Sequence, residues 1–179
     1  STWYNIFPLL PKPFPRALDP TSRAPTTPDA FSKVIPEELI RQELVLGRYA
    51  SCEHIPIPKV VLDCYRRFRP TPLVRATRLE HALKTPATIF YKREDVSPIG
   101  SHKLNTAFAQ AYYAKQEGAK TLITDTGAGQ WGTATALACR FFGLKNIVYM
   151  IRKSYEDKPY RVTMMRLSGA TVIPSPSRT

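Results

Sequence analysis

Apolar residues recur in the second half of the chain with helical and strand-like spacings. After residue 103 they fall at i, i+3, i+4, i+7 and i+8, as on the buried face of a helix. These positions are Leu104, Ala107, Phe108, Ala111 and Tyr112. The whole pattern predicts helices at 101–117, 130–142 and 158–167 and strands at 88–91, 121–124, 147–151 and 171–173. Strands alternating with helices favour right-handed crossovers, so the fold class is α/β with a mainly parallel sheet.

The N-terminal part of the chain has a different pattern, because eight of the chain's 17 prolines lie in residues 1–36. Proline fixes φ and donates no backbone hydrogen bond, which predicts extended, irregular structure. The same stretch carries many large apolar side chains, so we expect residues 1–36 to form an arm laid over the surface of a domain. Pro36 and Pro58 each open a predicted helix, and these helices end near Leu46 and Phe68.

Charge and cysteine content exclude several classes of protein. The net charge of +12 suits a nucleic-acid partner, but the basic residues are spread along the chain and form no known binding motif. No apolar run is long enough to span a bilayer. The three cysteines have neither disulfide-scaffold nor metal-ligand spacing. We therefore expect no nucleic acid, membrane or metal ion, and a reducing compartment, the cytoplasm.

A first candidate segment, residues 91–105, lies between a predicted strand and a predicted helix, where α/β folds bind ligands. Ser101 is a good N-cap, which places Lys103 in the first helical turn. The positive end of the helix, together with burial, favours the neutral amine that a Schiff-base lysine needs. The alternative is a surface lysine whose amine lies in solvent.

A second candidate segment, residues 124–132, has three glycines that let the backbone direct amide groups at an anion. Its spacing matches no nucleotide-binding fingerprint, so a small carboxylate suits it equally well. The alternative is a glycine-rich turn made for packing. Asp125 could serve as a general acid or base, hydrogen-bond a substrate nitrogen, or cap the next helix.

Together the two segments resemble the β subunit of tryptophan synthase, a fold-type II pyridoxal-phosphate enzyme, in its stand-alone type-2 branch. Within residues 100–106, Lys103 matches the family's Schiff-base lysine, and residues 126–131 match its carboxylate loop. Further matching segments are residues 3–6, 36–43, 69–73, 154–161 and 169–170.

The resemblance implies a fold of parallel sheets flanked by helices, incomplete at its C-terminal end. Residues 37–109 would begin the pyridoxal-phosphate domain, and residues 110–179 would form a mobile subdomain that closes over the substrate. The reaction would join serine or phosphoserine to indole, giving L-tryptophan. We expect a homodimer without a tight α subunit, because the arm could cover that face.

The resemblance also implies roles for individual residues. Lys103 would bind pyridoxal phosphate and carry the α-proton of the substrate. His102 would pack near the cofactor phosphate, unless it is a hydrogen-bonded core histidine. The residues expected to bind the substrate carboxylate are Thr126, Gly127, Ala128, Gly129 and Gln130, and Gln130 would also contact the cofactor.

Two features depart from the family. Asp125 stands where the family has a glutamate that helps the serine hydroxyl leave and steers the indole nitrogen. The side chain is shorter by roughly 1.3 Å, and a misplacement near 1 Å can cost on the order of a hundredfold in rate. The family's phosphate cradle lies further along its sequence, so we expect this chain to be the first part of a longer enzyme. The alternatives are β-replacement with another nucleophile and a catalytically impaired regulatory homologue.

Overall fold

The computed structural model describes residues 1–177 except 13–14, 16–17, 32–35 and 37–51, so the helix expected from Pro36 to Leu46 lies outside the described residues. The elements, in chain order, are β1 (Thr2–Tyr4), η1 (Phe7–Leu9), α1 (Pro28–Phe31), β2 (His54–Pro56), α3 (Lys59–Tyr65), β3 (Leu73–Arg75), α4 (Thr77–Leu83), β4 (Phe90–Lys92), η2 (Glu94–Val96), α5 (Lys103–Gln116), β5 (Thr121–Thr126), α6 (Gln130–Phe142), β6 (Lys145–Ile151), α7 (Arg152–Asp157), α8 (Pro159–Leu167) and β7 (Thr171–Ser175). Among the described residues, no helix combines the length and the apolar character needed to cross a membrane.

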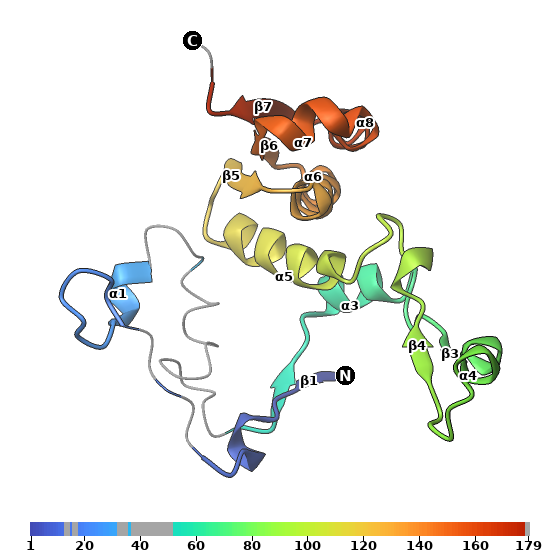
Figure 1. The fold of residues 1–179 in the computed structure, drawn as a ribbon. Helices are drawn as coiled ribbons and strands as arrows, with labels where there is room; N and C mark the ends of the chain where they lie inside the picture. The colour runs from blue at the N-terminus through green and yellow to red at the C-terminus, as the bar shows by residue number, and fades with distance from the viewer. Residues whose placement is uncertain (13–14, 16–17, 32–35, 37–51, 178–179) are drawn as a thin grey trace.

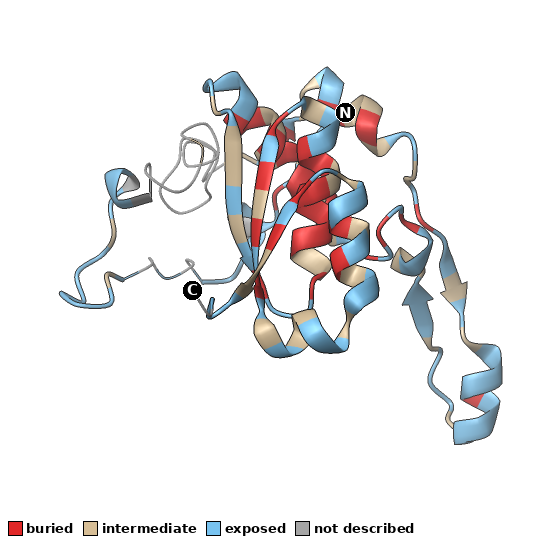
Figure 2. Cartoon of the chain, turned by 90° about the horizontal axis from the view of Figure 1, so that it is seen from above, coloured by how far each residue is buried: buried red, intermediate tan, exposed pale blue. Residues whose placement is uncertain are grey.

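A three-stranded parallel sheet, in the order β5-β6-β7, forms the centre of the fold. Its register places Thr124 beside Val148, and Val148 beside Val172. Figure 2 shows the buried helices of the core gathered on one side of this sheet. The predicted α/β class with a parallel sheet is confirmed.

The strand predicted at 88–91 does not belong to the parallel sheet, so that part of the prediction is wrong. It forms β4, which pairs antiparallel with β3 in a separate two-stranded sheet, Val74 facing Tyr91. Helix α4 lies between the two strands and ends at Lys84 in the left-handed conformation (φ 49°), which turns the chain back. This β3–α4–β4 unit projects from the body of the fold (Figure 1).

Helix α5 packs against α6 through small side chains. Both helices contribute fully or almost fully buried alanines, among them Ala107, Ala111, Ala134 and Ala138. Alanine at a contact lets two helix backbones approach closely, and the larger Leu104 fills the remaining space with no exposed surface. A second apolar cluster, which includes Val148, Met150 and Met165, joins the sheet to α6 and α8.

The N-terminal arm expected at 1–36 begins as a strand, β1, which pairs antiparallel with β2. Trp3 packs against the core cluster around α5 and α6. Beyond it, Ile6, Leu9 and Leu18 are exposed. Within the described residues, Trp3 is therefore the arm's apolar contact with that core.

A partly buried ionic contact joins the base of the β3–α4–β4 unit to η2. Nη1 of Arg69 donates to both Glu94 oxygens at 2.8 and 2.9 Å, and the Thr71 hydroxyl donates to Glu94 Oε1 at 2.7 Å. Burial raises the pKa of Glu94, but the hydrogen bonds from Thr71 and Arg69 outweigh it, so the pKa lies below the ordinary 4.5. Glu94 thus stabilises the fold in its charged form.

We expect Glu94→Gln to lower the free energy of unfolding by about 1–2 kcal/mol, because three hydrogen bonds, two from Arg69 and one from Thr71, lose their charged acceptor. Urea denaturation measures the loss. The wild-type advantage should be complete above pH 4.5 and disappear as the pH falls through the lowered pKa. Asp95→Asn is the control, since Asp95 pairs with Arg93 in solvent. An equal loss in both variants, or none in Glu94→Gln, would contradict the assignment.

Candidate functional site

The two candidate segments lie at the same edge of the parallel sheet (Figure 1). Helix α5 has 14 residues and spans roughly 21 Å, while the six residues of β5 span roughly 20 Å. A short turn joins the end of α5 to the start of β5, so α5 runs back along the strand. Lys103, the first residue of α5, therefore lies at the carboxyl edge of the sheet, as does the loop at 127–129.

The loop that leads to Lys103 has a fixed shape. The Ser97 hydroxyl donates to the Ser101 carbonyl at 2.9 Å and accepts the Ser101 amide at 2.9 Å. Gly100 has a φ of 65°, which favours glycine, and its amide donates to the Ser97 carbonyl at 2.9 Å. The Ile99 side chain is 3% exposed and belongs to the core cluster. Lys103 is thus held by a short, internally bonded loop with an apolar anchor.

Lys103 is half-buried, and its amine has no hydrogen bond or ion pair with any described residue. The expected cap is displaced by one residue: His102, not Ser101, is the N-cap. Ser101 still contributes, because its hydroxyl accepts the Lys103 amide at 3.3 Å. His102 is exposed, so the core-histidine alternative is wrong. Its expected place beside a cofactor phosphate stays a prediction.

The glycine loop, residues 127–129, leads into α6, and free amide groups are available at the start of that helix. Gly129 is the N-cap of α6, with a φ of 94° and no side-chain hydrogen bond. Asp125 therefore does not cap α6, and that alternative is wrong. The amides of Gln130 and Trp131, in the first turn, have no acceptor within the helix. With the positive end of α6, these donors suit a carboxylate.

Asp125 lies on the opposite face of the sheet from α6. The hydroxyls of Thr124 and Thr126 both accept hydrogen bonds from α6, from Trp131 Nε1 at 2.8 Å and from the Gly132 amide at 3.2 Å. Side chains alternate along a strand, so the Asp125 carboxylate points to the other face, where it is exposed. Its carboxylate is thus available to a ligand at this edge.

Sequence reasoning missed one residue of the site, Arg161 of α8. A Cβ atom built on Gly129 would lie 2.9 Å from Arg161 Cβ, so the two residues are in close contact. At its other end, Arg161 Nη1 donates to the Ile99 carbonyl at 3.5 Å. Arg161 falls within the segment 154–161, but its residue type gives no local signal of these distant neighbours.

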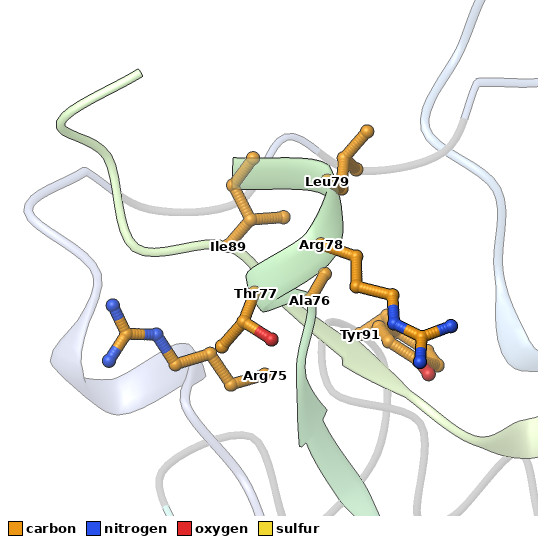
Figure 3. Close-up of a pocket in the computed structure, with 7 residues that line it drawn as sticks. All are labelled: Arg75, Ala76, Thr77, Arg78, Leu79, Ile89 and Tyr91. Atoms are coloured by element: carbon orange, nitrogen blue, oxygen red, sulfur yellow. The ribbon is translucent and has the colours of Figure 1, made fainter. Parts of the chain in front are cut away.

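A cavity of about 630 Å³ lies elsewhere, on the β3–α4–β4 unit. Figure 3 shows its lining residues, which include Arg78 of α4 and Tyr91 of β4. Arg75, also in the lining, forms an ion pair with Glu80 at 3.1 Å. Neither Lys103 nor the glycine loop contributes to this cavity, so it is separate from the candidate site.

The donor set at the sheet edge fits one part of a pyridoxal-phosphate site. An unpaired primary amine can bind an aldehyde, and the open amides of α6 can bind a substrate carboxylate. Residues 127–132 are the glycine-rich stretch of this sequence, and no second one is present to cradle a phosphate. No cluster of potential metal ligands occurs among the described residues.

Comparisons with known proteins agree with this chemistry. Residues 65–179 match the protein family described as "Pyridoxal-phosphate dependent enzyme". The chain is 53% identical to tryptophan synthase beta chain 2 of Methanosarcina mazei, covering 98% of this chain and 38% of that protein. It is 54% identical to the tryptophan synthase beta chain of Thermococcus gammatolerans, with 98% and 39% covered. It is also 54% identical to beta chain 2 of Aeropyrum pernix, with 99% and 39% covered.

These figures mean that the chain spans 38–39% of the length of the relatives it matches. Among solved structures, a pyridoxal 5'-phosphate-dependent aspartate racemase has a TM-score of 0.53 and 20% identity, covering 66% of this chain and 39% of that one. At that identity the likeness concerns the fold alone. Together with the family match, it confirms the fold-type II architecture.

We expect Gly132→Ala to destabilise the protein by about 1–3 kcal/mol, through overpacking. The new Cβ would lie 2.6 Å from Met165 Sδ and 2.7 Å from Val148 Cγ1. Thermal and urea unfolding measure the loss. Gly127→Ala is the matched control, because its Cβ meets only Ile151 Cδ1, at 3.7 Å. Equal stability of the two variants would show that α6 does not depend on this close approach.

Proposed function

Because the chain belongs to the family of pyridoxal-phosphate dependent enzymes, we propose that it serves a β-replacement reaction that joins L-serine or phosphoserine to indole, giving L-tryptophan. The observation that carries the proposal is that Lys103, at the start of α5, and the glycine loop lie at the same sheet edge, with Arg161 in contact with the glycine loop and with the loop that leads to Lys103. Support comes from 53–54% identity to tryptophan synthase beta chains over nearly the whole chain.

Lys103 is the residue that would hold the cofactor. Pyridoxal phosphate, when bound, supplies an aldehyde that captures amines and a ring that accepts electrons from the substrate's α-carbon. The Nζ atom of Lys103 has no competing partner among the described residues and lies where the sheet edge is open. Lys103 Nζ would also take the proton from the serine α-carbon and return one at the end of the reaction.

The glycine loop would hold the other end of the substrate. Its carboxylate would accept hydrogen bonds from the loop and from the first turn of α6, whose positive end favours an anion. The residues proposed to bind this carboxylate are Thr126, Gly127, Ala128, Gly129 and Gln130. Thr126 is buried, and its hydroxyl already accepts a hydrogen bond from the Gly132 amide. It would therefore orient the loop by joining the end of β5 to the first turn of α6. A fixed carboxylate leaves the β-carbon of the substrate open to indole.

Asp125 would assist departure of the serine hydroxyl and steer the indole nitrogen from the free face of β5. The shorter side chain favours a second candidate, a β-replacement with a different nucleophile, such as a thiol or a modified aromatic. A regulatory homologue with impaired catalysis is the third. The nucleophile is therefore decided by the reach of Asp125, and the cofactor chemistry by Lys103.

We also propose that residues 110–179 form the part that closes over the substrate and excludes water. Residues 37–109 would begin the cofactor domain, with His102 near the phosphate. The protein would act as a cytoplasmic homodimer without a tightly bound α subunit. Three free cysteines, with Cys64 and Cys139 buried, are compatible with a reducing compartment.

The first test of the proposal detects a covalent bond between the cofactor and Lys103. Added pyridoxal phosphate should give a visible absorbance band, and borohydride reduction followed by peptide mapping should place the label on Lys103. Lys103→Met should remove the label, whereas Lys120→Met, a change at an exposed lysine, should retain it. The experiment uses the longest available form of the protein, because the expected phosphate cradle lies beyond these residues. A label spread over exposed lysines, or no band from that protein, would overturn the proposal.

The second test concerns the nucleophile. Asp125→Glu should raise tryptophan formation from serine and indole, because it restores roughly 1.3 Å of reach. The gain should be up to about a hundredfold. Asp125→Asn, which keeps the length and removes the charge, is the control and should lower the rate. An unchanged or lower rate in Asp125→Glu would favour a different nucleophile.

A further inference from the structure

Arg161 connects the two loops of the site through opposite ends of one side chain. Its Cβ and Cγ lie 2.9 and 3.2 Å from the position of a Cβ built on Gly129, so its stem rests on the glycine loop. Its guanidinium reaches the Ile99 carbonyl, in the loop that leads to Lys103. These contacts link residues that are far apart in the sequence.

The surroundings of Arg161 direct its guanidinium to this carbonyl. Arg161 is half-buried, and it has no ion pair with any described carboxylate. A partly desolvated guanidinium needs acceptors for its donors, and the Ile99 carbonyl supplies one. The Tyr160 ring, with its centroid 5.5 Å from Arg161 Cζ, packs beside the cation. The cation is thus held by a carbonyl and a ring.

The loop that accepts this hydrogen bond is itself bonded to Lys103, so a movement of the loop would reach that residue. Ser97 and Ser101 tie the loop into one unit around Ile99, and the Ser101 hydroxyl accepts the Lys103 amide. A displacement of the Ile99 carbonyl therefore moves the first turn of α5.

We propose that Arg161 is a positioning residue, which fixes the separation between the Lys103 loop and the carboxylate-binding amides at Gly129. The effect of Arg161 on catalysis rests on the proposed function. The clamp, by which we mean the contacts of Arg161 with Gly129 and with the Ile99 carbonyl, is a property of the unliganded protein. Arg161 touches no reacting atom and acts through the two loops that it holds.

Amide hydrogen exchange in the unliganded protein separates the two contacts. Arg161→Met keeps Cβ and Cγ on Gly129 but removes the guanidinium. Exchange at Gly100 and Ser101 should then rise roughly fivefold, the factor of one ordinary hydrogen bond, while exchange at Gly132 and Thr133 stays unchanged. Arg161→Ala, which also removes Cγ, should raise exchange at all four amides.

Arg166→Met is the matched control, because Arg166 is an exposed arginine of the same helix whose guanidinium contacts the Tyr155 hydroxyl at 2.8 Å. It should leave all four amides unchanged. Two results would overturn the clamp: no change at Gly100 and Ser101 in Arg161→Met, or an equal rise throughout α8 and β6, which would indicate a general loss of stability.

A pyridoxal-phosphate titration, followed by absorbance, tests the catalytic meaning. Arg161→Met should bind the cofactor roughly fivefold more weakly than wild type, with partial recovery in Arg161→Lys and none of the loss in Arg166→Met. Equal binding by all variants would overturn the positioning role. If the longest available form of the wild type forms no band, the proposed function fails, and the exchange experiment still decides whether Arg161 holds the two loops together.

Discussion

The geometry of the site depends on how closely α6 approaches the sheet at Gly132. Any side chain there would meet Met165, Val148 and Thr126 within 3.0 Å. Because glycine leaves that space free, the Thr126 hydroxyl reaches the Gly132 amide, and the start of α6 lies directly above the end of β5. The open amides and the strand that carries Asp125 are set side by side by this one close approach.

The sequence predicts the elements whose limits are encoded locally. Helix α6 is found at its predicted bounds because glycines with positive φ, Gly129 and Gly143, stand at both ends. The strand at 88–91 was predicted, but β3, α4 and the antiparallel pairing of β3 with β4 were missed. The two strands have three residues each and are separated in the sequence by a helix, so periodicity does not reveal their pairing. The N-cap of α5 is His102, one residue after the predicted Ser101, a difference within the usual uncertainty of helix ends.

The candidate site shows the same division between local and tertiary information. Lys103 and residues 126–130 became candidates because residue type and loop composition indicate the chemistry that they could carry out. Arg161 was not, because an arginine in a helix is ordinary, and its significance lies in two contacts that only the folded chain creates. Sequence reasoning thus points to candidate groups for reaction or binding, and it overlooks those whose contacts hold other segments in place.

The fold is held by different forces in its two parts. Apolar burial joins α5, α6 and the parallel sheet, whereas ion pairs such as Arg69–Glu94 and Arg75–Glu80 hold the projecting β3–α4–β4 unit. At 1 M salt the screening length falls to about 3 Å, so charges that lie farther apart than directly paired atoms attract each other less, while apolar burial is not weakened. Guanidinium chloride is an electrolyte and urea is not, so guanidinium chloride weakens the longer-range charge attraction within the projecting unit in addition to apolar burial, whereas urea does not screen charges.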